Sequence, residues 1–86
     1  MIPQPNPEII ARILDAEAVL VMPIRGQVKV LNEVGARVWT LIDGIHSTDD
    51  IITTICQEYD TSLDTASNDI SEFLNQLAER GIITFA

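Results

Sequence analysis

The chain has 86 residues and a mass of 9.5 kDa, which leaves room for one small domain and no second. Hydrophobic residues make up 47% and charged residues 21%, a balance that excludes disorder caused by a lack of apolar surface. Thirteen acidic residues against five basic ones give a net charge of −8, the wrong sign for a protein that neutralises phosphates. We therefore expect a folded domain that does not bind nucleic acid.

Cysteine and histidine are too scarce to support a disulfide or a zinc site. The single cysteine, Cys56, has no partner in the chain, and with the single histidine, His46, it falls short of four zinc ligands. The longest apolar run, residues 18–24, contains a proline and is far below the roughly 18 residues of a membrane span. These features predict a cytoplasmic protein that needs no metal or other cofactor and does not enter a membrane.

The N-terminal third predicts strands after a proline-rich start. Residues 1–8 contain three prolines and are expected to form a tail, so that the domain proper spans residues 9–86. Valine and isoleucine dominate residues 9–15, 18–23 and 27–31, and the short connections between them predict three antiparallel strands.

The third predicted strand alternates between two kinds of side chain. Val28 and Val30 point to one face, whereas Gln27, Lys29 and Leu31 point to the other. We expect the valine face to be buried and Lys29 to meet solvent.

Helical periodicity replaces the strand pattern from Asn32 onward. The first helix is expected to begin at the cap residue Asn32, to end at Gly44 and to bury Val34, Val38, Leu41, Ile42 and Ile45. The second begins within residues 47–50 and the third near Ser62 or Asp64, ending at Arg80–Gly81; residues 82–85 then predict a brief closing strand. The order predicts an α+β fold in which a three-stranded antiparallel sheet is followed by three helices.

No constellation of residues indicates catalysis. His46 stands in a predicted loop, Cys56 lies on the apolar side of the second helix, and Asp49 with Asp50 is explained by the dipole of that helix. The four glycines are scattered and form no phosphate-binding loop. We therefore expect a protein that is not an enzyme.

Two features call for a close neighbour. Gly35 lies in the first turns of a helix, where glycine costs about 1 kcal/mol relative to alanine, and the only tryptophan, Trp39, follows four residues later. Trp39 either anchors the first helix or lines a groove for a partner. On the third helix, small residues border the apolar stripe beside Leu74; they are Ser67, Ser71 and Ala78.

Three blocks of this sequence together resemble a known family. They are residues 26–32 (GQVKVLN), residues 35–44 (GARVWTLIDG) and residues 69–82 (DISEFLNQLAERGI). The chain resembles the pyrroloquinoline quinone synthesis protein D (PqqD) family of peptide chaperones, also called RiPP precursor peptide recognition elements, over residues 9–85. The combination of strand end, cap, glycine and tryptophan is its most specific part.

The resemblance implies a winged helix-turn-helix fold and binding without catalysis. The leader segment of a ribosomally made precursor peptide would add as a strand to the third strand, beside the third helix, and be presented to a modifying enzyme such as a radical SAM enzyme, a peptidase or a cyclase. Gln27, Val28, Lys29, Val30 and Leu31 would then offer main-chain hydrogen bonds. The flank of the third helix with Ser67, Ser71, Leu74 and Ala78 would receive leader side chains; the flank with Asp69, Phe73 and Gln76 is the alternative.

Strand addition agrees with general physical chemistry, because an unpaired edge strand is a template for another chain and side-chain pockets add sequence choice. Two other functions stay open. An adaptor subunit could dock onto a biosynthetic enzyme without binding a leader. A winged-helix regulator of DNA is disfavoured because the third helix carries Asp64, Asp69, Glu72 and Glu79 against only Arg80.

Overall fold

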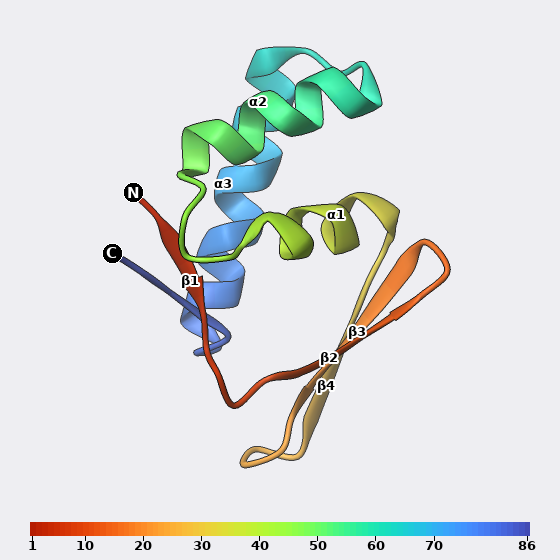
Figure 1. Cartoon of the computed structure of the whole chain (residues 1–86), viewed down its shortest axis with the longest axis vertical. Helices are drawn as coiled ribbons and strands as arrows, with labels where there is room; N and C mark the ends of the chain where they lie inside the picture. Colours follow the sequence, from red (N-terminus) through yellow and green to blue (C-terminus); the bar gives the residue numbers. More distant parts are fainter.

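The computed structural model describes all 86 residues and has three helices and two sheets (Figure 1). In chain order the elements are β1 (Pro3–Pro5), β2 (Ile10–Leu14), β3 (Glu17–Met22), β4 (Gln27–Leu31), α1 (Glu33–Leu41), α2 (Thr48–Tyr59), α3 (Leu63–Glu79) and β5 (Ile83–Phe85). The helix α1 contacts both the three-stranded sheet and α2, and α2 packs on α3. The predicted α+β class and the order of three strands before three helices are confirmed.

The main sheet is an antiparallel meander in the order β2-β3-β4, as the sequence predicts. A two-residue turn at Asp15 and Ala16 connects β2 to β3, and Asp15 takes a positive φ of 55° there. Such a turn makes Leu14 and Glu17 a hydrogen-bonded pair. Because hydrogen-bonded and non-hydrogen-bonded pairs alternate along an antiparallel ladder, the backbone groups of Ala18, Leu20 and Met22 point to β4.

The same alternation decides which backbone groups of β4 remain free. Lys29 pairs with Leu20, so the N–H and C=O groups of Lys29 point to β3. Those of Val28 and Val30 therefore point away from β3, to the open edge of the sheet.

The faces of β4 are the reverse of those expected. Val28 is 60% exposed and Val30 is 63% exposed, whereas Leu31 is buried and Lys29 is half-buried. The cause is the register, because Leu31 lies beside Ala18 and Lys29 beside Leu20, on the face that packs against the helices. Alternation alone marked two faces of the strand but not which of them the helices cover.

The proline-rich N-terminus forms a strand where a tail was expected. In this strand, β1, residues 3–5 pair with residues 83–85 of β5, and Pro3 is buried. Ile2 and Ala86 exchange backbone hydrogen bonds of 3.2 and 2.9 Å, which makes them a hydrogen-bonded pair. By alternation Pro3 and Pro5 occupy the positions that need no N–H donor, so the prolines are compatible with the ladder.

The first helix begins where predicted and ends earlier. The Asn32 side chain accepts a hydrogen bond of 2.9 Å from the backbone N–H of Gly35 and caps α1. The helix ends at Leu41, and Gly44 lies beyond it in a loop with a φ of 80°. Ile45, which the apolar stripe assigned to the core, lies beyond the helix and is exposed in consequence; Val34, in the first turn of α1 and also assigned to the core, is exposed as well.

The second helix begins with a capping box. The Ser47 hydroxyl accepts a hydrogen bond of 3.1 Å from the Asp50 N–H, and the Asp50 carboxylate accepts one of 3.1 Å from the Ser47 N–H. Hydrogen bonds that the Asp50 carboxyl accepts, first from the Ser47 backbone N–H and then from the Ser47 side chain, lower its pKa below the ordinary value of 3.8.

This capping box predicts a response to acid. Because the pKa of Asp50 is lower in the folded protein than in the unfolded chain, its ionised carboxylate stabilises the fold at pH values above 3.8. This stability is lost as the pH falls through the pKa that Asp50 has in the folded protein. We expect the melting temperature of the wild type to fall more steeply below that pH than the melting temperature of Asp50→Asn. Thermal unfolding monitored by circular dichroism at several pH values tests this, and parallel curves for the two proteins would contradict it.

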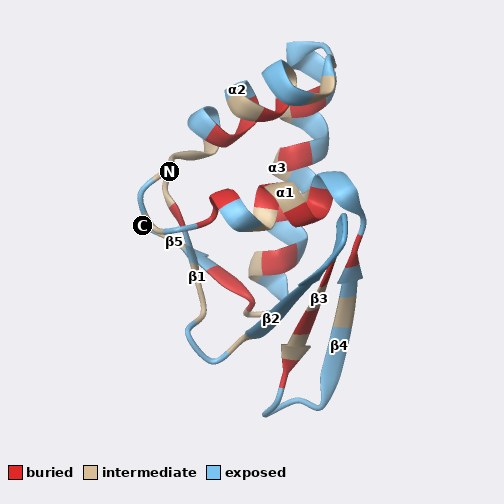
Figure 2. Cartoon of the chain, turned by 45° about the vertical axis from the view of Figure 1, so that its right-hand side comes forward, coloured by how far each residue is buried: buried red, intermediate tan, exposed pale blue.

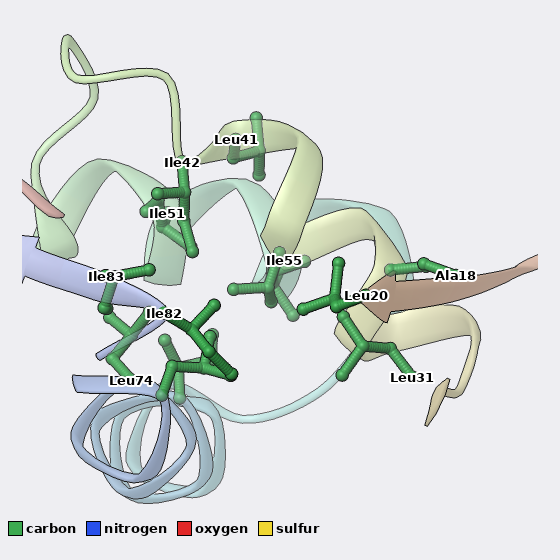
Figure 3. Packing of buried hydrophobic residues seen from close by; sticks show 14 of the residues in the cluster. Ala18, Leu20, Leu31, Leu41, Ile42, Ile51, Ile55, Leu74, Ile82 and Ile83 are labelled. Carbon is green, nitrogen blue, oxygen red and sulfur yellow. The ribbon is translucent and has the colours of Figure 1, made fainter. Parts of the chain in front are cut away.

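The core joins the sheet to the helices. Its 17 buried hydrophobic residues come from β3, β4, the three helices and the C-terminal strand region, and none comes from β2. Figure 2 shows buried residues along α1, α2, α3 and β3, and in Figure 3 the Leu20 side chain of β3 points toward Ile55 of α2 within this cluster. Every residue of β2 is exposed, whereas β4 contacts α1 and buries Leu31. Of the two edges of the sheet, β4 is therefore the one that borders the packed helices.

Candidate peptide-binding groove

A groove of about 430 Å³ lies between β4 and α3, with α1 contributing to its lining. Six of its ten lining residues are hydrophobic. The residues are Lys29, Val30 and Leu31 of β4, the cap residue Asn32, Val34, Gly35 and Val38 of α1, and Asp69, Ile70 and Phe73 of α3. An open strand edge and an apolar groove are therefore adjacent.

Gly35 lets two elements come close in this groove. A Cβ atom at position 35 would lie 3.6 Å from Cζ of Phe73, 3.4 Å from Cβ of Leu31 and 3.2 Å from Oδ1 of Asn32. The close neighbour that the glycine predicted is thus the end of β4 together with the ring of Phe73. A larger residue at this position would crowd the capping side chain and enter the groove.

The edge of β4 supplies unpaired hydrogen-bonding groups beside the groove. The N–H and C=O groups of Val28 and Val30 point away from β3, as the register dictates. No other strand of the protein pairs with β4 on that side. Such an edge can accept a further strand.

The groove carries one residue of each charge on opposite walls. Lys29 is on β4 and Asp69 is on α3. Neither takes part in an ion pair, because the chain has only two, Arg37 with Glu58 and His46 with Asp43. The pair between Arg37 and Glu58 joins α1 to α2 through contacts of 2.7 and 2.8 Å, and the Arg37 guanidinium lowers the pKa of the Glu58 carboxyl.

The structure brings together some of the expected site residues and separates others. Lys29, Val30 and Leu31 line the groove, while Gln27 and Val28 lie at the other end of β4 and outside its lining. On α3 the groove lies on the flank of Asp69 and Phe73, the second of the two alternatives, although Gln76 is not in its lining. The small residues Ser67, Ser71 and Ala78 do not line it, and Leu74 is buried in the core.

The contribution of α1 is the part that sequence reasoning missed. Val34 and Val38 were assigned to the core, and both line the groove. Val38 is buried in the core as predicted, whereas Val34 is exposed. The unusual glycine at position 35 was the available signal. Trp39 packs partly buried against the core and is outside the lining of the groove, in agreement with an anchoring role.

Cys56, His46 and Asp50, which were considered for catalysis or metal binding, have structural contacts in the fold. Cys56 is half-buried against the core, with its Sγ 3.8 Å from the backbone oxygen of Ser62. His46 contacts Asp43 through Nδ1 at 2.8 Å, and Asp50 belongs to the capping box. No three of the histidine, cysteine, aspartate and glutamate side chains gather as metal ligands would.

None of the helices combines the length and the hydropathy needed to cross a membrane.

Two solved structures are similar to this chain over nearly its whole length. The structure described as "TbiB1 in Complex with the TbiA(beta) Leader Peptide" has a TM-score of 0.88 and 27% sequence identity, covering 96% of this chain and 98% of that one. The structure described as "Lasso peptide synthetase B1 complexed with the leader peptide" has a TM-score of 0.87 and 25% identity, covering 99% of this chain and all of that one (100%).

Among curated proteins, none matches this chain significantly. The family described as coenzyme PQQ synthesis protein D (PqqD) matches residues 17–83, a stretch that includes β3, β4 and all three helices. The resemblance found in the sequence is therefore confirmed: the chain belongs to the PqqD family.

Proposed function

We propose that this chain binds the leader segment of a ribosomally synthesised precursor peptide and presents it to a modifying enzyme, with no catalytic step of its own. The observation that carries the proposal is the open edge of β4 directly beside the groove that β4, α1 and α3 line. The leader adds as a fourth strand next to β4, and alternate side chains of the leader enter the groove.

The chemistry of the groove suits a flexible apolar peptide. Main-chain hydrogen bonds to Val28 and Val30 give affinity with little regard to sequence, while the pocket around Gly35 and Phe73 selects an apolar side chain. Both similar structures are described as complexes with a leader peptide, which supports the same ligand for this chain. A leader that orders on binding is expected to have micromolar to nanomolar affinity.

Binding the leader would also hold the rest of the precursor near an enzyme. A core segment tethered to a bound leader reaches its enzyme at a high effective concentration. The enzyme is a radical SAM enzyme, a peptidase or a cyclase, and the similar structure described as a lasso peptide synthetase B1 favours a pathway of the lasso peptide kind. A short precursor gene next to such an enzyme gene would identify the pathway.

Val30→Pro tests strand addition. The Val30 N–H points to the open edge, so proline removes a donor that only an added strand uses and leaves the ladder with β3 intact. We expect at least about a tenfold loss of affinity, or about 1.4 kcal/mol, for a synthetic leader in isothermal titration. Val30→Thr keeps the N–H and a β-branched side chain and is expected to bind normally.

Ala11→Pro is the matched control at the other edge of the same sheet. Ala11 lies in β2, and by the same alternation its N–H also points away from β3. This variant should therefore keep its affinity for the leader. If Ala11→Pro and Val30→Pro lose affinity equally, β4 is not the docking edge; if wild-type protein binds no leader but does bind the enzyme, the chain is a docking adaptor.

A further inference from the structure

In the proposed complex, Lys29 lies opposite a leader residue whose side chain enters the groove. The backbone N–H and C=O groups of Lys29 point to β3. A strand added at the open edge therefore makes its main-chain hydrogen bonds to Val28 and Val30, the residues before and after Lys29. Whether the leader runs parallel or antiparallel to β4, residues directly opposite each other in a sheet point to the same face. The leader residue opposite Lys29 therefore shares the face of Lys29, which is the face of the groove.

The Lys29 ammonium group has no partner in the protein. The side chain is half-buried and lines the groove, yet Lys29 takes part in neither of the two ion pairs. Asp69 is exposed on the opposite wall, and a leader strand placed along β4 would lie between the two. A bound leader would remove water from Lys29 without bringing Asp69 nearer.

Desolvation of an unpaired charge is unfavourable, and an opposite charge with good geometry offsets its cost. Leu31, two residues further along β4 on the same face, borders Gly35 and Phe73 and offers only apolar contacts to the next leader side chain in the groove. The groove thus has a cationic end at Lys29 and an apolar end at Leu31, with one residue of β4, Val30, between them.

We propose that Lys29 is a specificity-determining residue that selects an acidic side chain in the leader, two positions from an apolar side chain bound near Leu31 and Phe73. This inference rests on the proposed function and adds the chemical class of leader that the groove takes. The one leader residue between these two positions projects on the other face, beside the exposed side chain of Val30.

Two selections from one random peptide display library test the proposal. The immobilised wild-type chain should enrich peptides with an aspartate or glutamate two residues from an aromatic or aliphatic residue. Lys29→Glu should enrich lysine or arginine at that same position and keep the apolar one. In titrations, exchanging the acidic residue of a selected peptide for lysine should weaken binding to the wild type about tenfold, or about 1.4 kcal/mol, and strengthen binding to Lys29→Glu.

Arg80→Glu is the matched control, because it changes the net charge by the same amount at the C-terminal end of α3, outside the groove. It should enrich the same peptides as the wild type. A charge preference that shifts equally in both variants, or a preference for basic residues in the wild type, would overturn the role of Lys29. Enrichment of apolar peptides with no charge preference would also overturn the role of Lys29, but it would leave the proposal of leader binding intact. Failure to enrich any peptide would contradict leader binding itself.

Discussion

Asp69→Trp is expected to lower the affinity of the chain for a leader by at least about a hundredfold, or about 2.7 kcal/mol. Asp69 lies on the exposed surface of α3 and lines the groove opposite β4. An indole at this position would occupy the space that leader side chains need, while the buried residues Ile70 and Leu74 stay in place. Isothermal titration with a synthetic leader measures the loss, and circular dichroism checks that the helices remain.

Gln76→Trp provides the control for added bulk on the same helix. Gln76 is also exposed, lies two turns further along α3 and does not line the groove. Its affinity for the leader should stay close to that of the wild type. Ser71→Trp, the variant that the small-residue flank would favour as a block, should bind normally as well; a strong loss in Ser71→Trp alone would return the leader to that flank.

Leu20→Ala is expected to destabilise the fold by about 3 kcal/mol, within the range for a buried leucine that leaves a cavity. Leu20 is fully buried in the central strand β3, where the sheet meets the helices (Figure 3). A change of this size lowers the melting temperature of a domain of this length by roughly 15 °C. Thermal or denaturant unfolding of the variant measures the effect.

Val28→Ala is the corresponding control on the sheet. This substitution also shortens an aliphatic side chain to alanine, but Val28 is exposed on the face of the sheet away from the helices. We expect a change in the free energy of unfolding within about 0.5 kcal/mol. Equal destabilisation by Leu20→Ala and Val28→Ala would mean that the face with the valines is covered.

Local chemistry was enough to place most elements of the fold. Asn32 caps α1 as predicted, and Ser47 and Ser62, which lie within the predicted start regions, cap α2 and α3; each combines a short oxygen-bearing side chain with a following helical period. The strands followed from β-branched residues between short connections. The end of α1 was misplaced because apolar residues continue at helical spacing past Leu41, although the chain leaves the helix there.

The site depends on tertiary geometry, which periodicity does not contain. Small residues flank one side of α3 and Asp69 with Phe73 the other, and only the packing of α3 against α1 and β4 decides which side lines the groove. The burial of Lys29 and the exposure of Val30 depend likewise on the register between β3 and β4. Gly35 predicted a close contact correctly, but the sequence could not identify the contacting residues as Leu31 and Phe73.

The pairing of β1 with β5 makes the chain almost a closed ring. Ile2 and Ala86 are joined by two backbone hydrogen bonds, and the two termini lie side by side in Figure 1. A short peptide linker between residues 86 and 1 would therefore span the gap without distorting the fold. New ends could then be opened in the exposed turn at residues 23–26, so that a circular permutant keeps every buried contact and moves its termini to the hairpin between β3 and β4.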